Sequence, residues 1–255
     1  MIDCNSLIYR CVMILSLYDC FKHWSKTGSV WLISDTHFGS NVGKYASITS
    51  DEQVALINAK VHKNDTLIIL GDVGDLSYIP RLKADYKILL KGNHDDKGDS
   101  KYKKTIQKRV YDADCLTAKE ICKMIATEIP YAKVNLFESY EFHMPFHRWT
   151  ATIDNNLFDE VYSGPLFISE KLVLSHEPIF GLEQFTVNIH GHCHDMKEQV
   201  GCNHLNIASD TIDFEPKNLD TLIKQGLISK VDSLHRVTID QATELKVKRS
   251  NVNVG

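Results

Sequence analysis

Thr66–Asp75 reads Thr-Leu-Ile-Ile-Leu-Gly-Asp-Val-Gly-Asp, a continuous apolar run that ends in glycine and aspartate. Such a run is typical of a strand covered on both faces, and the glycines let the backbone turn sharply where the strand ends. Because open α/β folds place their chemistry at the carboxyl ends of strands, we expect Asp72 to lie at a functional sheet edge. A lone strand-Gly-Asp sequence is more often an ordinary turn, so the prediction depends on further strand ends of this kind.

Four other apolar segments also end in Asp, Asn or His. The first three of the five strands, at 30–34, 66–70 and 87–91, form a βαβαβ pattern. The helix between the first two is predicted to begin at a capping box of Ser50 and Gln53. These three strands should be parallel with right-handed crossovers, so the polar ends meet at one sheet edge. The other segments and the residues that follow them are Val30–Ser34 with Asp35 and His37, Lys87–Lys91 with Asn93, Leu172–Leu174 with His176, and Thr186–Ile189 with His192 and His194.

Composition indicates the class of protein and its compartment. The chain has 255 residues, 43% hydrophobic and 24% charged, which is ordinary for a soluble globular protein. The net charge of −4 gives no global attraction to nucleic acid or to an anionic membrane. Seven cysteines without CxxC pairs favour reduced thiols over a disulfide framework or a zinc ribbon. We therefore expect a cytoplasmic protein without membrane association.

The sequence shows no internal repeat, low-complexity segment or Pro/Gly-rich linker, which favours a single domain over residues 1–255. Residues 1–29 should hold an amphipathic packing helix, since Leu7, Cys11, Leu15 and Tyr18 share one helical face. Its apolar stretch is too short to span a bilayer. Residues 241–255 are polar and basic and are expected to fray.

The segment from residue 96 to 162 is less regular. Thr117 and Glu120 form a second capping box before an amphipathic helix. Phe137–Phe142 and Pro165–Ile168 are predicted to be strands of a further sheet, and 166–169 with 172–174 a hairpin.

The seven polar residues at the strand ends have the chemistry of metal ligands. Carboxylate and amide oxygens mixed with imidazoles suit Mn²⁺, Fe or Zn²⁺ better than Ca²⁺, which prefers oxygen ligands only. Seven protein ligands are too many for one such ion, so two ions that share a carboxylate fit better, and Asp72 on the central strand is the expected bridge. Each motif alone is more often a turn or a packing contact. Their common position after apolar strands makes coincidence improbable.

In identity and order these motifs resemble those of the calcineurin-like metallophosphoesterase superfamily, and Ser34–Gly39 is similar to the start of its compact bacterial and phage members. The resemblance covers roughly Val30 to Ser209 and implies a four-layer α/β/β/α sandwich with two mixed β-sheets. It also implies two divalent metal ions, with Mn²⁺ expected first and Fe, Zn²⁺ or Ni²⁺ as alternatives. The resemblance assigns one metal to Asp35, His37 and His194 and the other to Asn93, His176 and His192. It assigns Asp72 as the ligand that bridges both. The motifs are Asp35-x-His37, Gly71-Asp72-x-x-Asp75, Gly92-Asn93-His94-Asp95, His176 and Gly191-His192-x-His194.

The activity that the resemblance implies is phosphoester hydrolysis, with a metal-bridging hydroxide as nucleophile. His94 then faces the leaving group as acid, and Asp75 orients its imidazole. Leu76 after the second motif and Asp95 in the third disfavour the protein phosphatases. No long cap domain is visible, so we predict a phosphodiesterase with an open site.

Three alternatives stay open. A metal-dependent nuclease is supported only by the basic run Lys97–Arg109, for which a solvated basic helix is the simpler interpretation. A phosphomonoesterase would use the same ligands. A non-catalytic scaffold is disfavoured because all seven ligands and His94 are present. Asp95 is expected to support the loops or cap a helix, and Cys193 to lie in a strand with its side chain directed away from the metals. The physiological substrate and the oligomeric state are not predicted.

Overall fold

The computed structural model describes residues 28–141, 146–169, 171–183, 186–194 and 203–226. The predicted packing helix, apart from its last two positions 28 and 29, and the predicted tail 241–255 lie outside these ranges. The predictions made for these two segments are therefore not tested.

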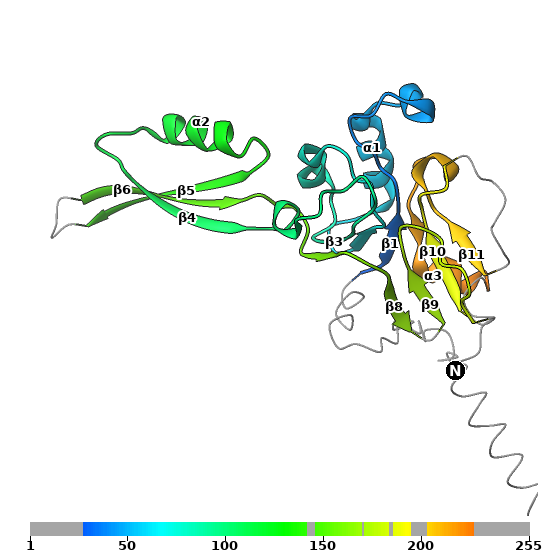
Figure 1. Cartoon of the computed structure of the whole chain (residues 1–255). Helices are drawn as coiled ribbons and strands as arrows, with labels where there is room; N and C mark the ends of the chain where they lie inside the picture. Colours follow the sequence, from blue (N-terminus) through cyan, green and yellow to red (C-terminus); the bar gives the residue numbers. More distant parts are fainter. Residues whose placement is uncertain (1–27, 142–145, 170, 184–185, 195–202, 227–255) are drawn as a thin grey trace, which may run out of the picture.

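A five-stranded mixed sheet lies at the centre of the molecule (Figure 1), in the order β12-β1-β2-β3-β7. Strands β1, β2, β3 and β7 are parallel, and β12 pairs antiparallel with β1. All four residues of β2 are buried, as expected of a strand covered on both faces. The parallel pairing of the first three strands is confirmed. The bounds are β1 Val30–Ile33, β2 Thr66–Ile69, β3 Tyr86–Leu90, β7 Glu160–Tyr162 and β12 Lys217–Asn218.

Helix α1 (Ser50–Lys60) connects β1 to β2, but its capping box begins one residue earlier than predicted. The Thr49 hydroxyl accepts from the Glu52 N–H and the Glu52 carboxylate accepts from the Thr49 N–H, at 3.2 and 2.8 Å. Ser50 is unavailable as the cap because its Oγ accepts from the Gly39 N–H at 2.7 Å. The helix is thereby tied to the loop that carries Asp35 and His37. A short 3-10 helix, η3 (Leu76–Arg81), connects β2 to β3.

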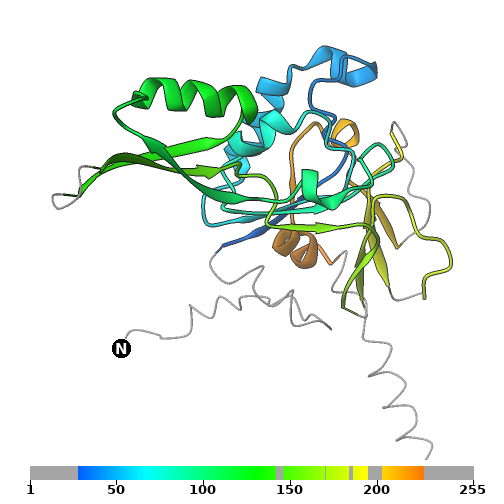
Figure 2. The same cartoon turned by 60° about the vertical axis from the view of Figure 1, so that its left-hand side comes forward.

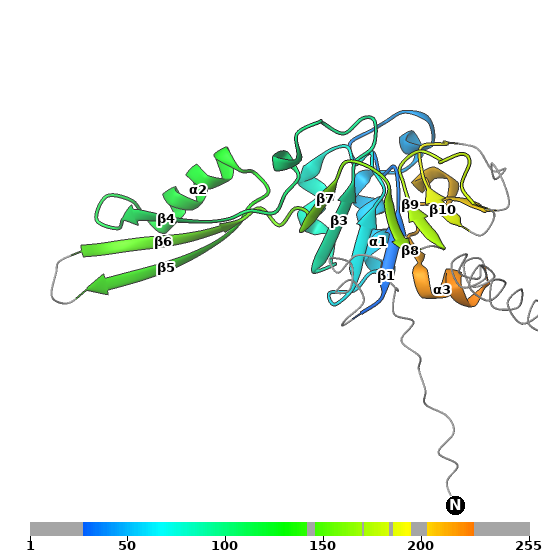
Figure 3. The ribbon, with the colours of Figure 1, turned by 60° about the horizontal axis from the view of Figure 1, so that its bottom comes forward.

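A second mixed sheet has the order β11-β10-β9-β8, with β8 and β9 forming the predicted hairpin. One hydrophobic cluster contains Leu32 and Ile68 of the first sheet together with Leu174 and Ile189 of the second. Figure 3 shows the strands of the two sheets next to each other. The fold is thus α/β with two mixed sheets around a shared core, and its four-layer description stays a prediction. The bounds are β8 Leu166–Ser169, β9 Leu172–Leu174, β10 Val187–His190 and β11 His204–Asn206.

A third, antiparallel sheet (β4-β6-β5) and helix α2 project from the β7 side of the molecule (Figures 1 and 2). We call residues 106–154 the arm. Its hydrophobic cluster is separate from the main core and is centred on Ile121, Ile125, Ala151 and Ile153. The capping box of α2 at Thr117 and Glu120 is confirmed. The bounds are β4 Ile106–Asp112, α2 Ala118–Glu128, β5 Lys133–Glu141 and β6 Phe146–Asp154.

Two predictions for this region were wrong. The segments 137–142 and 165–168 do not share a sheet, because β5 belongs to the arm and β8 to the second sheet. The basic run 97–109 is not a helix; it holds the short 3-10 helix η4 (Asp99–Lys101) and the start of β4. Successive residues of β4 alternate between the two faces of the arm sheet, so its charged residues are not arranged as they would be on the predicted helix.

The chain returns to the first sheet through the 3-10 helix η5 (Ser209–Thr211) and ends its described part in α3 (Leu219–Lys224). Gly226, at φ +77°, follows α3 in the left-handed conformation typical of a glycine at a helix end. Within the described ranges, no helix has the length and apolar character needed to cross a membrane.

Lys87 of β3 is buried at 1% exposure, an unusual place for an ammonium group. Its Nζ donates to Asn156 Oδ1 at 3.1 Å and to the Ala84 carbonyl at 3.3 Å. Burial lowers the pKa of Lys87 from 10.5 to about 8, although the nearby charge of Asp159 opposes this. Between these two pH values the unfolded chain binds more protons than the folded one, so stability rises with pH.

Replacement of this lysine should flatten the pH dependence of stability. We expect the free energy of unfolding of the native chain to gain up to about 3 kcal/mol between about pH 8 and pH 10.5, and Lys87→Met to lack this gain. Urea denaturation of both proteins at several pH values measures the difference. The same change at the exposed Lys63 is the control. Parallel profiles for native chain and Lys87→Met would contradict the prediction.

Candidate metal centre

Four of the seven predicted metal ligands have strained backbone. Asp35, His37, Asp72 and His192 have φ values of 53°, 39°, 53° and 64°, in the left-handed region that non-glycine residues rarely adopt. Each such residue costs on the order of 1 kcal/mol, and strain of this kind concentrates at functional sites. Backbone hydrogen bonds hold the loops together, with Asp35 N donating to Gly71 O and His37 N to Asp72 O.

The loops also approach the carboxylates so closely that two positions require glycine. A Cβ at Gly191 would lie 2.1 Å from Asp35 Oδ2, and one at Gly92 would lie 2.2 Å from Asp72 Oδ1. Any side chain there would displace a carboxylate. The glycines of the predicted motifs therefore position the acidic groups.

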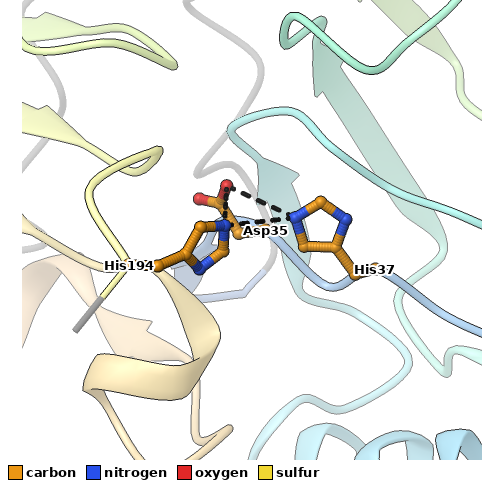
Figure 4. Close-up of side chains that lie close together, drawn as sticks. All are labelled: Asp35, His37 and His194. Carbon is orange, nitrogen blue, oxygen red and sulfur yellow. Dashed lines mark hydrogen bonds and ion pairs between the residues drawn. The ribbon is translucent and has the colours of Figure 1, made fainter. Parts of the chain in front are cut away.

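The first cluster of ligand atoms consists of Asp35, His37 and His194 (Figure 4). The Nε2 atoms of the two histidines are 3.3 Å apart. Asp35 Oδ1 lies 3.8 Å from His37 Nε2 and 3.5 Å from His194 Nε2. Two imidazole nitrogens and a carboxylate oxygen thus face one small space, as ligands of a metal ion do.

The second cluster consists of Asn93, His176 and His192. Asn93 Oδ1 lies 2.8 Å from His176 Nε2 and 3.0 Å from His192 Nδ1, and the two nitrogens are 3.3 Å apart. His176 Nδ1 lies 2.8 Å from the Leu70 carbonyl. Since a carbonyl only accepts, Nδ1 carries the proton, and Nε2 is the ring nitrogen that faces the cluster.

Asp72 lies between the two clusters. Its Oδ2 is 3.8 Å from His37 Nε2 and 3.4 Å from His176 Nε2, while its Oδ1 accepts from the His94 N–H at 2.9 Å. Asp35 also faces both sides, because it groups with His37 and His194 and, separately, with Asp72 and His176. The seven side chains predicted from the sequence are thus brought together in two groups with acidic residues between them.

The donor set has the properties of a cation site. Asp35 is fully buried, its Oδ2 accepts from the His192 N–H at 2.8 Å, and its Oδ1 has no hydrogen-bond partner among the described residues. Burial raises the pKa of Asp35, although the neighbouring histidines oppose it. Burial likewise lowers the pKa of His37. A buried carboxylate oxygen without a donor is costly, and a bound cation would remove that cost.

A carboxylate outside the predicted set, Asp210 of η5, supports the first cluster. Its Oδ1 lies 3.1 Å from His194 Nδ1, and this hydrogen bond is the main cause that raises the pKa of His194. A carboxylate on the far ring nitrogen fixes the tautomer and makes a ligating imidazole more basic. Sequence reasoning missed Asp210 because a lone Ser-Asp after a strand has no distinctive spacing.

Loss of this support should weaken the centre without unfolding it. We expect Asp210→Ala to lower metal affinity or activity by about 10–100-fold, the usual effect of removing the partner of a ligating histidine. Equilibrium dialysis against Mn²⁺ and phosphodiester turnover measure the two quantities. The control is Asp213→Asn, at an exposed position with φ 56° that Asn tolerates. Equal affinities for the native chain and Asp210→Ala would remove Asp210 from the centre.

The remaining predicted residues lie beside the clusters. The His94 ring is 5.8 Å from that of His37, centroid to centroid. Asp75 accepts from the Ser77 N–H at 2.9 Å and caps η3; no hydrogen bond joins it to His94. Asp95 accepts from the N–H groups of Gly92 and Asp72, both at 2.9 Å, and so fastens two motif loops together.

Two hollows border the centre. One, of about 410 Å³, is lined by His37, His94 and His194 together with Lys44 and Tyr45. The other, of about 520 Å³, is lined by Asn93 and His176 together with Lys91, Ser163 and Glu177. Each hollow therefore contacts one of the two ligand clusters.

One detail differs from the predictions. Strand β10 ends at His190, so His192 and Cys193 lie in a loop, and the two-residue alternation of a strand does not orient them. His192 and His194 accordingly reach different clusters. His147 belongs to β6 of the arm, where it contacts Asp114 and Glu138.

Comparison with known proteins identifies the family. A family model described as calcineurin-like phosphoesterase matches residues 28–205. The chain belongs to this family and is a metal-dependent phosphoester hydrolase. A crystal structure of a protein of unknown function, AQ665 from Aquifex aeolicus, is similar with a TM-score of 0.45 and 18% identity, covering 77% of this chain and 98% of that one. The comparison with curated proteins finds no match.

Proposed function

We propose that this hydrolase is a phosphodiesterase with two divalent metal ions. The observation that carries the proposal is the buried Asp35 Oδ1, which accepts no hydrogen bond within the part of the chain that the structure describes and faces the Nε2 atoms of His37 and His194. The position of Asp72 Oδ2 between His37 and His176 supports a second ion beside the first. Mn²⁺ is the metal proposed, because it accepts oxygen and imidazole ligands together; Fe, Zn²⁺ and Ni²⁺ are alternatives.

Two such ions would lower the pKa of a water held between them and draw charge from the phosphoryl oxygens. His94, on the wall of the first hollow, is the proposed acid for the leaving oxygen. The hydrogen bond from its own N–H to Asp72 Oδ1 fixes its loop relative to the proposed bridge. Asp75 stays the proposed orienting group for the His94 ring.

The preference for diesters rests on the two hollows. A phosphate at the centre has space on the side of His37 and His194 for one substituent, and on the side of Asn93 and His176 for another. A monoester would use only one of these spaces. No residue of the basic run 97–109 lines either hollow, so we rank the nuclease below a small diester substrate. The free thiols of Cys115, Cys122 and Cys193 are compatible with the proposed cytoplasmic location.

The test compares bis-p-nitrophenyl phosphate with p-nitrophenyl phosphate after chelator treatment and reloading with Mn²⁺. We expect turnover only in the reloaded protein, and faster turnover of the diester. Faster monoester turnover would contradict the diester preference. If the reloaded protein retains Mn²⁺ but cleaves neither ester, the proposal in this form is wrong. Single-stranded DNA and cyclic nucleotides as further substrates distinguish a nuclease from a small-molecule diesterase.

A further inference from the structure

The arm sheet leaves a long strand edge free. Strand β5 pairs only with β6 within the part of the chain that the structure describes. It has nine residues, contains no proline and pairs with β6 without a bulge. Proline, bulges and short length are three of the means that protect an edge from another strand; charged side chains are a further one, and β5 carries Lys133 and Glu138. The edge of β5 is therefore open to a further strand.

Exposed apolar side chains are concentrated on the same sheet. Phe137, the middle residue of β5, is 70% exposed, and Val110 of β4 is 60% exposed. Both lie opposite Thr150 of β6, so the three side chains form one row across the sheet. Their neighbours Leu136 and Tyr111 pack on the α2 cluster, so this row lies on the uncovered face. Five of the eight exposed large apolar residues among those described belong to the arm: Ile106, Val110, Met124, Phe137 and Tyr140.

The sequence of β5 is complementary to itself when two copies run antiparallel about Phe137. In that register Phe137 lies opposite Phe137, and Val134 opposite Tyr140. Asn135 then lies opposite Ser139, and Lys133 opposite position 141, a glutamate in the sequence. Apolar, polar and oppositely charged residues are matched at these positions, as in stable cross-strand pairs, whereas Leu136 lies opposite Glu138. A shift of one copy by two residues in one direction sets Glu138 opposite Glu138, which is destabilising, and a shift in the other direction sets Glu138 opposite Val134 and Phe137 opposite Asn135.

We propose that two copies of this chain associate through the edges of β5, so that the two arm sheets form one continuous sheet. The contact is isologous, because the same strand on each copy supplies both halves. Burial of the two Phe137 rings against each other supplies the apolar centre. The arm projects away from the main sheets (Figure 1), so this contact leaves both metal centres accessible. The proposal is independent of the catalytic one.

A cysteine at the centre of the strand tests the register. Opposite residues of antiparallel strands have Cα atoms about 4.5–5.5 Å apart, within the range of about 4.4–6.8 Å that a disulfide accepts. Under mild oxidation, we expect Phe137→Cys to yield disulfide-linked dimers well above the background of the native chain, whose own cysteines give that background. Val110→Cys, on the same face at the other edge of the sheet, is the matched control and should stay at background. Equal or preferential cross-linking of Val110→Cys would overturn the proposal.

Sedimentation equilibrium of the full chain tests the association itself. We expect a reversible dimer for the native chain. In Phe137→Lys, which sets two like charges opposite each other, the dissociation constant of the dimer should rise at least about tenfold. Phe180→Lys changes an equally exposed phenylalanine outside the arm and should leave the dimer intact. Circular dichroism confirms that both variants are folded. A monomeric native chain, or equal weakening by the two variants, would show that β5 is not the contact.

Discussion

Asp72→Asn should lose phosphodiester turnover by about 10³-fold or more and should no longer hold two ions per chain. The reason is the position of its Oδ2, which lies 3.8 Å from His37 Nε2 in one cluster and 3.4 Å from His176 Nε2 in the other. An asparagine keeps the size of the side chain and an oxygen for the His94 N–H, but removes the negative charge that two cations would share. Metal content by atomic absorption, together with turnover of bis-p-nitrophenyl phosphate, measures both effects.

The matched control for this variant is Asp85→Asn, an exposed aspartate that directly precedes β3. We expect it to keep both ions and full turnover. Circular dichroism of the metal-free proteins shows whether Asp72→Asn is folded, so that lost turnover is attributed to the centre. Retention of two ions by Asp72→Asn at native affinity would exclude Asp72 as the bridge, and Asp35, which also faces both clusters, would take its place.

The proximity of the seven candidate ligands could be predicted because metal-binding chemistry constrains both residue type and position. Parallel strands end at one edge of a sheet, so Asp35, Asp72 and Asn93 had to lie close together once their strands were recognised. The strained backbone at Asp35 and Asp72 could not be predicted, since aspartate does not by itself indicate a positive φ. It follows from packing of the loops, where Gly92 and Gly191 leave no space for a relaxed alternative.

Other features were invisible because they depend on a single contact or on tertiary packing. Asp210 acts through one oxygen on His194, and no spacing marks such a partner. Lys87 looks like the polar boundary of a strand, yet the packing of residues around Asn156 and Ala84 encloses it. An alternating segment such as β5 predicts a strand but not the sheet that it joins, and for that reason the arm was not anticipated.

His94→Asn should lower phosphodiester turnover while metal content stays at the native value. The His94 side chain lines the first hollow and its ring lies beside that of His37, but it belongs to neither ligand cluster. General acid catalysis by a positioned side chain contributes about 10²–10⁴-fold. The loss should depend on the leaving group, because p-nitrophenolate departs without protonation whereas an alkoxide requires a proton. We therefore expect a small loss with bis-p-nitrophenyl phosphate and a large one with a dinucleotide.

The variant Asp75→Asn distinguishes the proposed role of Asp75 in orienting the His94 ring from its role as the N-cap of η3. Asparagine is as good an N-cap as aspartate, so the hydrogen bond to Ser77 and the stability of η3 should be preserved. If Asp75 orients His94 during turnover, the variant loses activity on the dinucleotide in the same sense as His94→Asn, and the double variant loses little more than His94→Asn alone. Native turnover in Asp75→Asn would limit this residue to its cap.

Loss of metal in His94→Asn would instead make His94 a ligand, because an acid that only faces the leaving oxygen has no part in holding the ions.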